Sequence, residues 1–203
     1  METTNQNSVT FDENQSLQVL KEMINISQKK LKNNGILFIV WGWVSFVTQF
    51  FEFVLNEIPH SLLVSTFKGY LNYALALFGI GFTIWHIYQK SNKANTYIDI
   101  SLRYVWISMF GGMVLINLIQ ANVLHKITFE LQLPIFMVLT SIALTVTGGI
   151  LRYKMIVAGG IAFGLLAYAA SFFPLHQQIL IQSIAWAIGF IIPGHILYAN
   201  RNK

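Results

Sequence analysis

The pattern of apolar and polar positions divides the chain into a polar start and six long apolar runs. Each run is close to the roughly 20 residues that a helix needs to cross a hydrocarbon core about 30 Å thick. Backbone amides inside a bilayer must pair within their own segment, so the runs predict helices rather than strands. We therefore expect an all-α membrane protein with a transmembrane domain over residues 35–200. The predicted spans are 36–55, 70–88, 104–124, 131–151, 155–173 and 179–199.

The polar start has two parts. Residues 1–15 lack apolar periodicity, which predicts a disordered tail. Between Ser16 and Lys32, apolar residues occupy about half of a helical wheel and charged residues the other half, which predicts an amphipathic helix over residues 16–34. Asn33-Asn34-Gly35 then predicts a break before the first span. This helix either lies on the inner leaflet or docks on a cytoplasmic protein or a second copy of the chain.

Composition predicts that the chain lies in a lipid bilayer, and the distribution of charge predicts its orientation in the membrane. Hydrophobic residues make up 55% of the chain and charged residues 10%, against about 25% charged in soluble domains, so the lipid bilayer is the expected surrounding. Only Lys68 and Lys126 fall on one predicted side of the membrane, and all other Lys and Arg fall on the other side. Cytoplasmic loops are the positively charged ones, which predicts both termini in the cytoplasm. This topology accounts for the net charge of +5, and no motif points to nucleic acid.

Parts of the chain resemble one another. VWGWVSF (40–46) resembles VAGGIAF (157–163), and GIGFTIWHIY (79–88) resembles AIGFIIPGHILY (187–198). The second comparison pairs His86 with His195 and leaves one extra residue at Pro193-Gly194. A weaker likeness in the middle suggests three parallel two-helix repeats, although a shared bias toward Gly and aromatic residues could also produce such matches. The repeat predicts an inner-face histidine pair, His86 and His195.

Few polar side chains lie inside the predicted spans. Glu52 is the only carboxylate among them, and Gln49 lies three residues earlier on the same side. Asn117 and Gln120 share one face of the third span. Polar groups inside a bilayer are costly, so these four residues form a candidate proton or substrate site. The alternative is that Asn117 and Gln120 make hydrogen bonds between helices.

The outer loops each carry one histidine: His60, His125 and His176. Imidazoles beside the carboxylates of Glu57 and Glu130 could bind a divalent metal ion, or they could simply be solvated at the interface.

The fifth span has a stripe of small residues that predicts close helix packing: Gly160, Gly164, Ala167 and Ser171. The chain has no cysteine, Walker A loop, HExxH or GxSxG motif, so we expect no enzyme activity and no cofactor.

Three apolar segments resemble a known type of protein. The first is NNGILFIVWGWVSF, preceded by SLQVLKEMINISQKKLK, and the others are TGGILRYK (147–154) and IGFIIPGHILY (188–198). Here the chain resembles a family of small uncharacterised membrane proteins of Bacteroidetes-type bacteria. The resemblance implies six spans and a location in the bacterial inner membrane, with no assigned activity and no functional residue.

Two functions are compatible with these features. We favour a non-enzymatic membrane module that senses, regulates or scaffolds, because charge inside the spans is sparse and the amphipathic helix over residues 16–32 suits docking. The alternative is a transporter of a small solute, protons or metal ions that uses Glu52 and the outer-face histidines.

Overall fold

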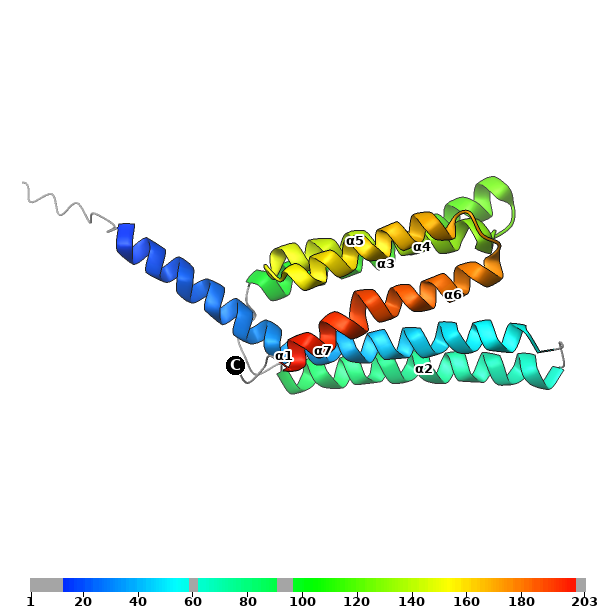
Figure 1. Cartoon of the computed structure of the whole chain (residues 1–203), viewed down its shortest axis with the longest axis horizontal. Coiled ribbons are helices and arrows are strands. Elements are labelled where there is room, and N and C mark those ends of the chain that lie inside the picture. Colours follow the sequence, from blue (N-terminus) through cyan, green and yellow to red (C-terminus); the bar gives the residue numbers. More distant parts are fainter. Residues whose placement is uncertain (1–12, 59–61, 91–96, 200–203) are drawn as a thin grey trace, which may run out of the picture.

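The computed structural model describes residues 13–58, 62–90 and 97–199, and every element in that part of the chain is a helix (Figure 1). The all-α prediction is confirmed. The elements are α1 (Glu13–Asn56), α2 (Leu62–Lys90), α3 (Tyr97–Leu124), α4 (Phe129–Ile150), α5 (Lys154–Ala170), α6 (Leu175–Trp186), the π-helix η1 (Ala187–Ile191) and α7 (Ile192–Ala199).

Four described segments are long and apolar enough to cross a membrane: Gly35–Asn56, Ile98–Leu124, Phe129–Ile150 and Leu175–Ala199. α2 and α5 lie outside this set, and α5 is short, with 17 residues. The count of six spans therefore stays a prediction. Residues 1–12 of the tail predicted over residues 1–15 lie outside the described residues.

α1 is one helix of 44 residues that includes the whole predicted amphipathic segment. It continues through Asn33, Asn34 and Gly35, so the predicted break there was wrong. Asn and Gly inside a helix each cost about 0.5–1 kcal/mol, which tertiary packing can outweigh. Gly35 is buried against α7, and a Cβ built on it would lie 3.1 Å from Leu197 Cδ2. We attribute the continuous helix to this packing.

The helices lie side by side in an order different from their order in the chain. α1 packs against α2 on one side and against α6, η1 and α7 on another. α6 packs against α5, α5 against α4, and α4 against α3 (Figure 1). The N-terminal part of α1 extends beyond the other helices (Figure 1).

The closest backbone approach joins α4 and α5. A Cβ built on Gly148 would lie 2.6 Å from Val157 N, and one built on Gly160 would lie 2.8 Å from Thr145 N. The Ser141 hydroxyl also donates a 2.8 Å hydrogen bond to the carbonyl of Gly160. Small residues are required here because any larger side chain would force the two helices apart.

The predicted small-residue stripe lies partly in this contact. Gly160 and Gly164 face α4, where Cβ atoms would meet Thr145 and Ser141, and Ala167 is buried. Ser171 is exposed just after α5 and donates a hydrogen bond to the carbonyl of Tyr168.

The last apolar run contains a π-helical turn before its proline. Pro193 has no N–H to donate, and its ring would clash with the carbonyl four residues earlier, at Gly189. Gly189 lies inside η1, and the N–H of Ile192 donates to the carbonyl of Ala187 in the wider π pattern. A π turn holds an additional residue within a helix. It thus accommodates the extra residue that the sequence comparison placed beside Pro193-Gly194.

Candidate functional site

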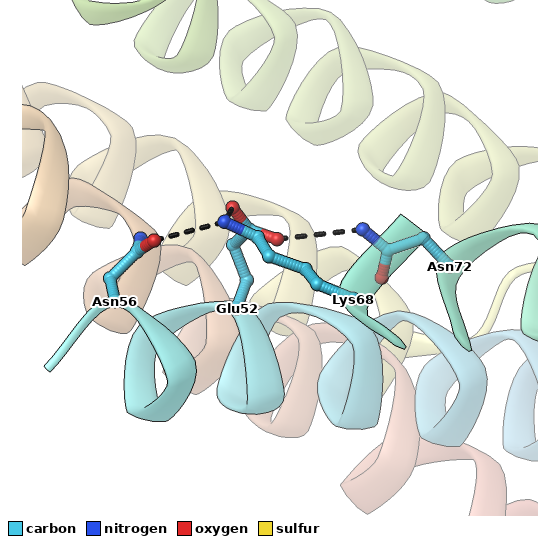
Figure 2. Close-up of polar contacts among 4 residues, drawn as sticks. All are labelled: Glu52, Asn56, Lys68 and Asn72. Carbon is cyan, nitrogen blue, oxygen red and sulfur yellow. Dashed lines mark hydrogen bonds and ion pairs between the residues drawn. The ribbon is translucent and has the colours of Figure 1, made fainter. Parts of the chain in front are cut away.

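Glu52 forms an ion pair with Lys68, and two asparagines complete the cluster (Figure 2). Lys68 Nζ donates a 2.9 Å hydrogen bond to Asn56 Oδ1, and Asn72 Nδ2 donates a 3.4 Å hydrogen bond to Glu52 Oε2. Glu52 and Asn56 are one turn apart on α1, and Lys68 and Asn72 are one turn apart on α2. Sequence analysis placed Lys68 in an outer loop, but α2 begins at Leu62 and already includes it.

This cluster is largely sheltered, with side-chain exposures of 26% for Lys68 and 22% for Glu52. The two opposite charges compensate each other, which lowers the cost of holding either one between apolar helices. Gln49 is half-buried one turn before Glu52 on α1. The arrangement is therefore suited to joining α1 to α2, because Glu52 already has a cationic partner.

The outer histidines have separate surroundings. His176 Nε2 lies 2.8 Å from Glu57 Oε1, and its ring stacks on Phe53 with a centroid distance of 4.3 Å. His125 follows α3 with a φ of 51°, a left-handed conformation that often ends a helix. His60 lies outside the described residues. In the described part of the chain, no group of three His, Cys, Asp or Glu could hold a metal ion.

Asn117 and Gln120 take part in hydrogen bonds between α3 and the start of α4. Gln132 Nε2 donates a 2.6 Å hydrogen bond to Asn117 Oδ1, and Thr128 N donates a 3.0 Å hydrogen bond to Gln120 Oε1. Asn117 Nδ2 in turn donates to the carbonyl of Met113. Asn117 and Gln120 thus belong to one hydrogen-bond network, as their spacing suggested. Glu52 is not part of this network, since α3 packs against α4, whereas α1, which carries Glu52, packs against α2.

The inner-face histidines have different neighbours. His195 Nδ1 lies 2.9 Å from the carbonyl oxygen of Ile191, and its ring lies edge-on to Trp43 of α1. His86 stacks on Phe82 within α2. α2 contacts α1 through Trp41, whose Nε1 donates a 2.9 Å hydrogen bond to Thr83 Oγ1.

The contacts of Trp41 and Trp43 on α1 bear on whether His86 and His195 form a pair. Trp41 and Trp43 are two residues apart and so point to different sides of α1. The glycines that the repeat would pair also differ: Gly81 has open space at its Cβ position, whereas Gly189 meets Phe163 and Leu144. These neighbours do not bring His86 and His195 together, and the repeat and the pair stay predictions.

Sequence reasoning missed Lys68, Asn72 and Gln132 as partners. Their spacing carries a weak signal, since Lys68 and Asn72 are four residues apart, as are Glu52 and Asn56. Two such pairs on neighbouring antiparallel helices can meet, but only the fold shows that these helices are neighbours.

No family model, curated protein or solved structure shows a significant match to this chain. The length and apolar composition of four described helices indicate its class, a helical membrane protein.

Proposed function

We propose that this protein is a non-enzymatic module of the bacterial inner membrane that presents the N-terminal part of α1 to a cytoplasmic protein partner. The supporting observation is the continuity of α1. At about 1.5 Å per residue its 44 residues extend roughly 66 Å, whereas the candidate span within it covers only Gly35–Asn56.

The continuous helix argues for docking over a position flat on the inner leaflet. A helix lying on the membrane needs a turn before the first span, and α1 has none at residues 33–35. Leu17 and Val19 are about half exposed, beside exposed Lys21 and Glu22. Apolar side chains among charges on a projecting helix suit a protein partner.

The other part of the proposal is six crossings with both termini cytoplasmic. Trp41 contacts Thr83 and Glu52 contacts Lys68, so α2 runs antiparallel to the candidate span of α1 at the same depth. α5 similarly covers the depth of α4, since Gly160 meets Thr145. If α1 and α4 cross the bilayer, their antiparallel neighbours cross with them. A periplasm-active reporter fused after Lys203 should stay silent, and an active reporter would contradict this topology.

Docking is tested by photocrosslinking in native membranes. A photoreactive amino acid at Leu17 or Val19 should give a discrete adduct with another protein. The matched control is Leu63, which is 83% exposed near the start of α2, at the other end of the bundle. If positions 17 and 19 give only lipid adducts, or the same adducts as position 63, the docking proposal fails.

The transporter alternative receives less support from the geometry. Glu52 pairs with Lys68, and the carboxylate that contacts His176 is that of Glu57. A proton or ion flux in proteoliposomes that is abolished by Glu52→Gln would reverse this preference.

A further inference from the structure

Three glutamines are almost fully buried where α3 ends and where α4 and α6 begin. Gln120, Gln132 and Gln178 have exposed fractions of 5%, 8% and 2%. In each amide one atom is bonded: Gln178 Nε2, for example, donates a 2.8 Å hydrogen bond to the carbonyl of Phe173. The other atoms, Gln120 Nε2, Gln132 Oε1 and Gln178 Oε1, have no hydrogen-bond partner among the described residues, and neither does Gln182 Oε1 one turn further along α6.

The contact between α4 and η1 puts Gln132 and Gln178 at the same depth. A Cβ built on Gly189 would lie 3.1 Å from Leu144 Cδ2, and α4 and α6 run in the same direction (Figure 1). Gln132 precedes Leu144 by 12 residues and Gln178 precedes Gly189 by 11. At about 1.5 Å per residue these distances are roughly 18 and 16.5 Å.

A second contact gives the same depth for Gln120. The rings of Trp106 in α3 and Phe190 in η1 lie 6.1 Å apart. Gln120 follows Trp106 by 14 residues, close to four full turns, so both lie on nearly the same side of α3. Gln178 precedes Phe190 by 12 residues, so the depths differ by only about 3 Å.

We infer that these amides form a binding site for a small uncharged solute that both donates and accepts hydrogen bonds, such as a primary amide or a short polyol. Buried amide groups without a partner are costly, so a ligand that satisfies several of them gains binding energy. The unpartnered atoms are one N–H donor and three oxygen acceptors, and all four side chains are uncharged. An ion would find no compensating charge among them, which favours a neutral ligand.

The test uses the full chain in lipid nanodiscs with glutamine side chains labelled with ¹⁵N. Acetamide and glycerol are titrated separately, which distinguishes an amide ligand from a polyol. We expect the side-chain NH₂ signals of Gln120, Gln132 and Gln178 to shift saturably with one of the probes. In Gln178→Met, which keeps the length of the side chain but removes its amide, binding should weaken about five- to tenfold through loss of a hydrogen bond.

The control is Gln177→Met, since Gln177 is the exposed neighbour of Gln178 on α6. It should bind the probe as the unmodified chain does. Gln132→Met provides a second test if Gln178→Met does not fold. No saturable shift with either probe, or equal affinity in the folded Met variants and the control, would overturn the site and leave bound water as the partner of these amides. This outcome is independent of docking by α1.

Discussion

Replacing Lys68 by Met should destabilise the fold by leaving Glu52 without its cationic partner. The variant keeps an unbranched apolar side chain one atom shorter than that of lysine, but loses the ion pair and the hydrogen bond to Asn56. Exposed ion pairs contribute about 0.2–1 kcal/mol, whereas removing one partner of a fully buried pair costs about 3–5 kcal/mol. With both side chains about one quarter exposed, we expect an intermediate loss of about 1–3 kcal/mol.

Glu52→Gln should cost less than Lys68→Met, because the new amide oxygen can still accept from Asn72 and Lys68 keeps Asn56. The double variant has no charge in the cluster. Its loss should therefore be smaller than the sum of the two single losses by about 1–2 kcal/mol.

Unfolding in mixed micelles by added denaturing detergent, followed by tryptophan fluorescence, measures these free energies. Lys126→Met is the control, since Lys126 is exposed between α3 and α4, and its change should stay within about 0.5 kcal/mol. If the two single losses simply add in the double variant to within about 0.5 kcal/mol, the ion pair makes no net contribution and the reasoning is refuted.

Two further predictions concern packing. Gly160→Ala places a Cβ 2.8 Å from Thr145 N and should destabilise the fold by about 1–3 kcal/mol, whereas Gly149→Ala, with nothing within 4 Å of its Cβ position, should be neutral or stabilise by up to about 1 kcal/mol. Equal effects in the same unfolding assay would contradict the close α4–α5 contact. His176→Ala should lose about 0.5–1.5 kcal/mol through the ring stack on Phe53, and an unchanged midpoint would show that this stack adds nothing.

The presence of the helices could be predicted from the sequence better than the residues at which they begin and end. The apolar runs locate helices because lipid leaves the backbone no other spanning structure than a helix or a closed barrel. The local signal at Asn33-Asn34-Gly35 pointed to a break, yet Leu197, far away in the sequence, packs on Gly35 and the helix continues. The second predicted span began only at Tyr70, but α2 starts at Leu62.

For the candidate sites, too, the sequence predicted some contacts and not others. Asn117 and Gln120 share a network, as expected from their spacing on one helix face. The partner of Glu52 could not be predicted, because a carboxylate in an apolar run shows only that some compensation is needed. Which residue provides it depends on the antiparallel register of α1 and α2, which Trp41 and Thr83 help to set.

The close contact between α4 and α5 has a consequence for biogenesis. Only three residues separate the two helices, and Arg152 adopts a φ of 52° in that turn. Residues 131–151 and 155–173 contain no Asp, Glu, Lys or Arg, whereas Arg152 and Lys154 lie at the turn. Under the proposed topology, such a hairpin would insert as one unit, with Arg152 and Lys154 kept on the cytoplasmic side. The glycines on the facing sides of α4 and α5 would then pack against the other helix before they contact lipid.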